Sequence, residues 1–175
     1  MSYYYLAYGS NLHPGRLTDR VSTLSCCGPA TIPGFCIEFN KKGKDNSGKA
    51  NLVAKPGGTA YGAVYLINVQ AKTKLDAIEG PGYRFEPLPV LLEGAEIEVY
   101  AYIARQSWTN ESILPFDWYH ALVVAGVHYW QLPADYANRI KNIESRPDLA
   151  SERADYHQNL LMHLKRITHT EGNLS

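Results

Sequence analysis

The stretch YYYLAYGSNL at residues 3–12 gives the first strong indication of both the fold and a site. Its aromatic run has strand character and stops abruptly at Gly9, Ser10 and Asn11. A helix start follows at once, because Pro14 suits the first turn of a helix. A strand that breaks at a glycine and turns into a helix presents several backbone N–H groups to one point. Such a turn can bind carboxylates, phosphates or developing oxyanions.

A second feature is a lone carboxylate, Glu79, directly before the Gly/Pro bend at residues 80–82. Leu75 and Ile78 precede it on a predicted helix, and aromatic residues follow. A carboxylate in such surroundings loses solvation, so its pKa is expected to rise toward neutrality. This suits a general acid/base. The competing interpretation is a surface acid at the end of a helix, which is the usual environment of a single Glu.

Composition and charge exclude several classes of protein. The chain has 175 residues, 45% of them hydrophobic, and 17 basic residues balance 17 acidic ones. This predicts one globular domain and argues against a nucleic-acid or membrane-surface binder. No segment approaches the ~20 apolar residues of a membrane span. The lysines between residues 41 and 49 alternate with Gly, Asp, Asn and Ser, which favours a solvated loop over a binding patch.

Cysteine and histidine spacing gives no sign of a disulfide framework or a metal site. The cysteines are three, an odd number, and two of them are adjacent. The simplest interpretation is a reducing compartment, and we expect a cytoplasmic protein without a signal peptide. The six histidines are scattered rather than clustered, so no metal site is expected.

The order of predicted elements indicates an α+β fold. Strand patterns dominate the first two-thirds, including Ala50–Lys55, a turn at Pro56–Gly58 and a strand over Thr59–Ile67. Prolines 87 and 89 mark an edge strand. Helical patterns fill the last third. We therefore expect a small bent mixed sheet or β-barrel with helices packed outside. Residues 1–145 form the domain, and residues 146–175 form a C-terminal helical extension packed on it.

Two other chemistries fit the first turn poorly. Ser10 as a nucleophile lacks the Gly-x-Ser-x-Gly pattern, since Tyr8 and Leu12 stand where glycines are needed. A phosphate loop would need more glycines and a following Lys.

The two features occur together, in this order, in a known family. The sequence Tyr8–Leu12 followed by Glu79–Tyr83 resembles the γ-glutamylcyclotransferase (AIG2-like) family. Further matching segments extend the resemblance over roughly residues 3–143: Pro33–Asn40, Gly62–Tyr65, Tyr102, Tyr119 and Leu132–Tyr136.

The resemblance implies a reaction and a set of site residues. The family converts a γ-glutamyl amide to 5-oxoproline and releases an amine or amino acid, as a transferase or lyase-type enzyme without a cofactor. Glu79 would be the general acid/base. The implied substrate-binding residues are Tyr8, Gly9, Ser10, Asn11, Leu12, Tyr83, Tyr102 and Tyr119.

The implied partner is a small γ-glutamyl molecule, with no nucleic acid and no membrane. The edge near Pro87–Pro89 and the C-terminal helix are candidate contacts for a homodimer. Two alternatives stay open: a non-catalytic domain that binds a small molecule or a protein on the same fold, and an enzyme acting on a different amide, such as a γ-glutamyl amine.

Overall fold

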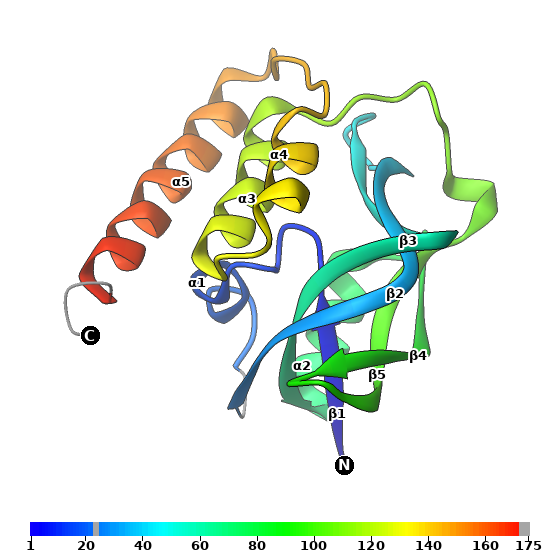
Figure 1. Cartoon of the computed structure of the whole chain (residues 1–175). Helices are drawn as coiled ribbons and strands as arrows, with labels where there is room; N and C mark the ends of the chain where they lie inside the picture. Colours follow the sequence, from blue (N-terminus) through cyan, green and yellow to red (C-terminus); the bar gives the residue numbers. More distant parts are fainter. Residues whose placement is uncertain (23–24, 172–175) are drawn as a thin grey trace.

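Strand β1 (Ser2–Ala7) lies at the centre of the architecture. It pairs antiparallel with β3 (Gly48–Asn68) over its whole length, and in parallel with β5 (Ala95–Ala104) at Tyr5↔Tyr100. The remaining strands are β2 (Ser25–Lys42) and β4 (Tyr83–Leu92). The computed structural model describes residues 1–22 and 25–171, with side chains as far as Arg166 (Figure 1).

The strands close into a barrel in the order β1-β3-β2-β4-β5, which confirms the predicted α+β class. Closure between β2 and β4 is short, with partners only at Ala30↔Leu92 and Thr31↔Leu91. The stretch of β4 that holds Pro87 and Pro89 therefore pairs with β5 alone. Since proline has no N–H to donate, this is the edge that the two prolines predicted.

The predicted turn at Pro56–Gly58 does not end a strand. Strand β3 continues through it, and its pairing with β2 holds on both sides, at Phe35↔Ala54 and Pro33↔Thr59. Gly57 takes a φ of 72°, which lets the backbone bulge without breaking the ladder. The short strand and the following strand predicted from the sequence are thus one element.

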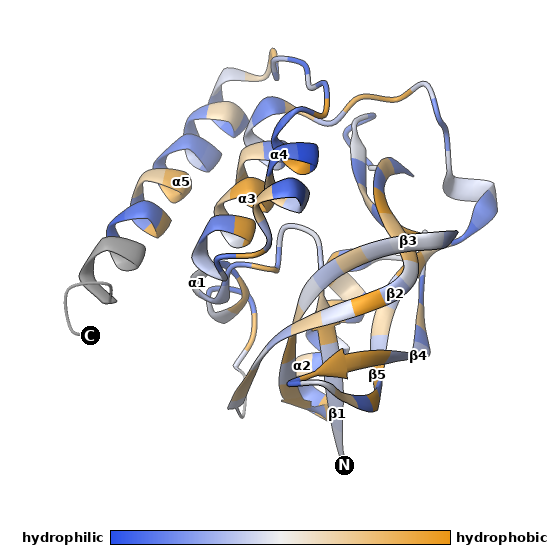
Figure 2. Ribbon diagram, viewed as in Figure 1, coloured by the Kyte–Doolittle hydropathy of each residue, from blue (hydrophilic) through white to orange (hydrophobic). Residues whose placement is uncertain are grey.

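Helices occupy the outside of the barrel. Their bounds are α1 Pro14–Thr18, α2 Val69–Glu79, α3 Asp117–Tyr129, α4 Ala134–Lys141 and α5 Ser151–Glu171, with a short 3-10 turn at Gln106–Trp108. Helices α1, α3, α4 and α5 gather on one side of the barrel (Figure 1). The C-terminal helix α5 alternates apolar and polar residues (Figure 2), and it buries Leu161 and Leu164 against this group.

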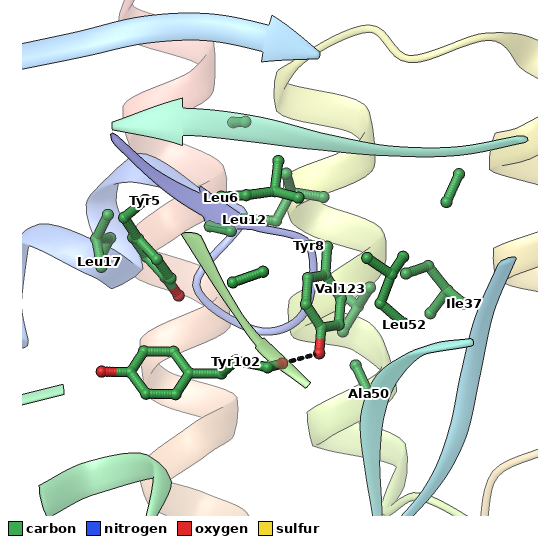
Figure 3. Packing of buried hydrophobic residues seen from close by; sticks show 14 of the residues in the cluster. Tyr5, Leu6, Tyr8, Leu12, Leu17, Ile37, Ala50, Leu52, Tyr102 and Val123 are labelled. Carbon is green, nitrogen blue, oxygen red and sulfur yellow. Dashed lines mark hydrogen bonds between the residues drawn. The ribbon is translucent and has the colours of Figure 1, made fainter. Parts of the chain in front are cut away.

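The core runs through the barrel and beneath the helices. Figure 3 shows buried leucines of this core beside Tyr5, Tyr8 and Tyr102: Leu17 lies on the side of Tyr5, and Leu52 lies on the side of Tyr8. Two of these tyrosines, Tyr5 and Tyr8, are buried side chains with polar tips, which need partners inside the protein. Those partners form the site described next.

Candidate functional site

The turn after β1 has the compact geometry expected of a strand-to-helix connection. The N–H of Leu12 donates to the carbonyl of Gly9 at 3.0 Å. Gly9 has no room for a side chain, because a Cβ there would lie 3.0 Å from that of Ala50. In the described part of the chain the N–H groups of Ser10 and Asn11 have no hydrogen-bond partner. These two donors are therefore available to a ligand.

Gly9, Ser10 and Asn11 line a small cavity of about 30 Å³, here called the inner pocket. Its other walls come from strands at one end of the barrel, from the turn after β1 and from helices α2 and α3: Tyr5, Tyr8, Ala50, Glu79, Tyr83, Tyr102 and Tyr119. All the site residues predicted from the sequence line this pocket except Leu12.

The prediction for Leu12 is wrong. Its side chain is fully buried and faces α3, where a Cβ on Gly126 would lie only 2.7 Å from that of Leu12. Its carbonyl accepts hydrogen bonds from the Tyr65 hydroxyl at 3.0 Å and from the Trp130 indole at 2.9 Å. Leu12 anchors the turn to the core and does not face the pocket.

Glu79 is the last residue of α2 and points toward the turn after β1. The Asn11 Nδ2 donates to Glu79 Oε1 at 3.1 Å. The side chain is 19% exposed, and Arg20 Nη1 lies 3.9 Å from the same oxygen. Gly80 follows with a φ of 72°, which ends the helix and turns the chain into the bend.

Burial raises the pKa of the Glu79 carboxyl, and this effect outweighs the opposing influence of Arg20, Lys41 and the Asn11 hydrogen bond. The C-terminal end of α2, which carries partial negative charge, also disfavours the carboxylate. Glu79 is therefore easier to protonate than a surface Glu, as the sequence predicted.

Asn11 joins the turn to the rest of the pocket. Its Nδ2 donates to the Tyr5 hydroxyl at 3.1 Å as well as to Glu79. Its Oδ1 accepts from Arg20 Nη1 at 2.9 Å. The carboxamide thus has partners at both ends and holds the carboxyl of Glu79 in one place.

Two tyrosines meet at the backbone of Ala50. The Tyr83 hydroxyl donates to the Ala50 carbonyl at 2.7 Å, and the Tyr119 hydroxyl accepts from the Ala50 N–H at 3.1 Å. Burial raises the pKa of Tyr83 well above its usual value and that of Tyr119 to about 12. Both hydroxyls stay protonated at neutral pH, and the Tyr119 hydroxyl also has a hydrogen-bond interaction with the Ser10 side chain.

Tyr102 contributes its ring and its carbonyl, and its hydroxyl faces elsewhere. The carbonyl accepts a hydrogen bond from the Tyr8 hydroxyl, and the phenol of Tyr102 points away from it (Figure 3). That phenol donates to Asp76 Oδ1 on α2 at 2.8 Å. No pattern in the sequence indicated that this hydroxyl would bind Asp76 on α2 rather than face the inner pocket.

Sequence reasoning missed two members of the inner pocket. Tyr5 belongs to the aromatic run of β1, and its burial together with Tyr8 could have been suspected from the strand pattern. Ala50 contributes only backbone atoms to the tyrosine hydrogen bonds, so no signal in its side chain could have identified it.

A larger cavity of about 280 Å³, here called the outer chamber, adjoins the inner pocket. Ser10, Glu79, Tyr83 and Tyr119 line both. The outer chamber extends from there to α1, to the turn at residues 43–45 and to the first turns of α5. Glu79 therefore stands where the two cavities meet.

The prediction of a solvated lysine loop is wrong for Lys41 and Lys49, which line this chamber. Lys41 is 5% exposed, and its ammonium lies 4.5 Å from the centre of the Tyr83 ring. Lys49 lies over Tyr119 and pairs with Asp45 at 2.7 Å. Aromatic rings that lie far from the loop in sequence cover both stems.

Comparison with known proteins places this architecture. A family model for γ-glutamyl cyclotransferase, AIG2-like, matches residues 5–121, a span that contains every residue of the inner pocket. The chain belongs to this family. It is 30% identical over 152 residues to the γ-glutamylcyclotransferase of Bos taurus, covering 82% of this chain and 79% of the relative. The Homo sapiens γ-glutamylcyclotransferase is 30% identical over 153 residues, with the same coverage.

A solved structure of a γ-glutamyl cyclotransferase superposes with a TM-score of 0.78 at 26% identity. The match covers 91% of this chain and 99% of that structure, so it must include part of residues 146–175. The resemblance inferred from the sequence is thus confirmed at the level of family and fold.

Two features are absent from the described residues, a metal-binding cluster and a membrane-spanning helix. No group of three or more His, Cys, Asp or Glu side chains in that part of the chain is placed to hold a metal ion. None of its helices combines the length and apolarity that crossing a membrane requires.

Proposed function

We propose that this chain catalyses the intramolecular cyclisation of a γ-glutamyl amide to 5-oxoproline, with release of an amine or amino acid. The observation that carries the proposal is the placement of Glu79. The Glu79 carboxyl has a raised pKa and is held by the side chain of Asn11. It lines the same small pocket as the turn after β1, whose backbone offers free N–H donors. Relatives named γ-glutamylcyclotransferase support the same reaction class.

Glu79 first acts as a base. The α-ammonium group of the substrate cannot attack until it loses a proton, and the Glu79 carboxylate accepts it. The freed amine then forms a bond to the γ-carbonyl carbon of the same molecule, and the carbonyl oxygen becomes an oxyanion. Because both reacting groups belong to one bound molecule, holding it folded supplies much of the rate.

The turn after β1 stabilises the intermediate. The unpartnered N–H groups of Ser10 and Asn11 are suited to bind an oxyanion or the α-carboxylate of the substrate. Loss of one donor to an oxyanion typically costs about 3 kcal/mol of transition-state stabilisation. The Tyr119 hydroxyl is a further donor at the same pocket.

Glu79 then acts as an acid. The bond from the γ-carbon to the departing nitrogen breaks as the carboxyl returns a proton to that nitrogen, so the amine leaves without negative charge. The protons lost by the attacking nitrogen end on the departing one, and Glu79 is a carboxylate again. The step therefore needs no external oxidant, reductant or nucleophile.

The test is Glu79→Gln, measured as 5-oxoproline released from a panel of γ-glutamyl dipeptides and γ-glutamyl amines. Glutamine keeps an oxygen for Asn11, so the fold is retained while turnover falls at least about 10³-fold. Glu96→Gln, on an exposed position of β5, is the matched control and keeps wild-type turnover. Wild-type rates in Glu79→Gln would refute the role of this residue. A wild-type chain that binds γ-glutamyl compounds without converting them would favour the non-catalytic alternative.

A further inference from the structure

The outer chamber is strongly basic. Two carboxylates, Asp45 and Glu79, line it. The basic side chains that line it are more numerous: Arg16, Arg20, Lys41, Lys44, Lys49 and Arg153. An excess of positive charge inside a concave surface attracts anions.

Most of these cations already have partners or are solvated. Lys49 pairs with Asp45 at 2.7 Å, and Arg153 pairs with Asp148 at 2.5 Å. Arg20 donates to the Asn11 carboxamide, and Lys44 is exposed to solvent. These four charges therefore need no further ligand.

The remaining two cations, Arg16 and Lys41, are buried and lack a counter-ion. Arg16 is 6% exposed and Lys41 is 5% exposed. Among the described residues neither has a carboxylate within salt-bridge distance. Arg16 is hydrogen-bonded to the Tyr156 side chain, but its Nε has no partner in the described part of the chain, and the Lys41 ammonium contacts aromatic rings. Burial lowers the pKa of Arg16 to about 10, so the guanidinium is still charged at neutral pH. A buried charge without a partner is costly, and a ligand can remove that cost.

His157 of α5 adds a neutral hydrogen-bonding group to the same chamber. Its ring stacks on Trp118 with 3.6 Å between ring centres, and its Nδ1 is buried without a partner within the described part of the chain. Burial and the nearby cations Arg16, Lys49 and Arg20 lower its pKa to about 4, so it does not add charge at neutral pH.

Arg16 and Lys41 reach the reacting carboxyl from different elements. Arg16 belongs to α1, and Lys41 lies near the end of β2. Each is close enough to Glu79 to lower the pKa of that carboxyl. A molecule cyclising at Glu79 would therefore extend its other half between them.

We propose that the outer chamber holds the departing half of the substrate, and that this half carries two carboxylates, one bound by Arg16 beside His157 and one by Lys41. The assignment rests on the proposed function, which leaves the N–H groups of the first turn to the γ-glutamyl half. The substrate class is then γ-glutamyl derivatives of acidic amino acids. His157 lies outside the span 5–121 matched by the family model, so this wall is not part of the matched family pattern.

The test compares two substrates that differ in a single group, γ-glutamyl-glutamate and γ-glutamyl-glutamine. The wild-type chain is expected to prefer the glutamate derivative by at least about 10-fold in kcat/KM, mainly through KM. Equal kcat/KM for the two substrates would overturn the proposal.

Two variants locate the preference. Arg16→Gln and Lys41→Met each remove one cation without a carboxylate partner. The variant that removes the partner of the side-chain carboxylate is expected to bring the ratio of the two substrates close to one. The other variant removes the partner of the shared α-carboxylate, so it is expected to raise KM for both substrates by a similar factor. Lys41→Met is included because loss of a buried arginine can also lower stability, which thermal unfolding of both variants measures. Lys42→Met, on the exposed neighbouring position of β2, is the control and keeps the wild-type ratio. An unchanged ratio in folded Arg16→Gln and Lys41→Met would refute the assignment of these residues.

A binding measurement separates this proposal from the proposed reaction. Glu79→Gln is titrated with both dipeptides by calorimetry, and tighter binding of the glutamate derivative is expected. If Glu79→Gln binds the glutamate derivative more tightly but the wild-type chain turns over neither dipeptide, the two-anion chamber is supported and the proposed reaction is refuted. Turnover without any preference in rate or binding would keep the reaction and remove the chamber.

Discussion

The inner pocket and the outer chamber meet at Glu79. They differ in how many of their polar and charged side chains have a partner within the protein. In the inner pocket each tyrosine hydroxyl has a hydrogen-bond partner, and the Asn11 carboxamide is bonded at both ends. In the outer chamber Arg16 and Lys41 are buried without a carboxylate among the described residues. The first region is held rigid by its own contacts, whereas the second is left with charge that a ligand can neutralise. Rigid geometry favours chemistry, and unbalanced charge favours selection.

After Glu79→Gln, the largest expected effect on turnover comes from Asn11→Ala, which removes the side chain that orders the inner pocket. Without the carboxamide, Glu79 loses its donor, and a displaced base can cost about 10²-fold in kcat. Since the Asn11 hydrogen bond lowers the pKa of Glu79, the acidic limb of the pH–rate profile should move to higher pH. The preference between the glutamate and glutamine substrates should persist. An unchanged pH profile would show that Asn11 does not position the acid.

Asp148→Asn disturbs only the outer side. Asp148 accepts from Trp118 Nε1 at 2.7 Å and from two nitrogens of Arg153, and Arg153 holds the pKa of this carboxyl well below its usual range. Arg153 is partly exposed, so we expect a loss of about 2 kcal/mol rather than that of a fully buried pair.

The pH dependence of that loss checks its origin. A depressed carboxyl pKa stabilises the fold above the ordinary carboxyl pKa, and this stabilisation disappears as the pH falls through the folded value. The difference in unfolding free energy between wild type and Asp148→Asn should therefore shrink from pH 7 toward pH 3. Asp155→Asn, on an exposed position of α5, should show no difference at either pH. A fall in kcat for Asp148→Asn would contradict the separation of the two regions.

Gly82→Ala tests the packing at the border of the two regions. A Cβ at this position would lie 2.7 Å from Lys41 Cε and 2.9 Å from Trp108 Cε3. Overpacking of this kind costs about 1–2 kcal/mol here, since the end of a lysine stem can move. Denaturant unfolding measures the cost, and KM for the glutamate derivative should rise because Lys41 is displaced. Wild-type stability would show that the Gly82 site has more space than the structure indicates.

The smallest expected effect is a gain in stability rather than a loss, and it comes from Glu79→Gln. Burial raises the pKa of Glu79, so its contribution to stability is present at low pH and is lost as the pH rises through the folded pKa. Glu79→Gln should therefore be more stable than wild type at pH 7, by on the order of 1 kcal/mol. Thermal unfolding should show the gain vanish at acidic pH. Lower stability at pH 7 would mean that the charged carboxylate is favoured by the fold.

The sequence predicted the residues whose role depends on local chain geometry. Gly9, Ser10 and Asn11 form a turn because of their own order, and Glu79 ends its helix before a glycine. The prediction that Leu12 binds substrate was wrong, because its side chain packs against α3, which lies far along the chain.

The errors and omissions have one physical cause. The Tyr102 hydroxyl turns to Asp76, Lys41 is covered by aromatic rings from elsewhere, and Ala50 acts only through its backbone. Each depends on a tertiary neighbour that no local pattern encodes. The barrel itself was predictable, because strands followed by helices leave few ways to bury both.

The position of α5 has a consequence for how such proteins can diverge. Glu79, the proposed acid, lies on a helix in the middle of the chain, and His157 lies on the last helix, beyond the matched family span. On the proposed assignment, exchanging a few side chains near the C-terminus would change which amine departs without altering the residues proposed to close the ring. Relatives could then share one reaction and differ in substrate. Their sequences would be expected to differ most in the C-terminal helix.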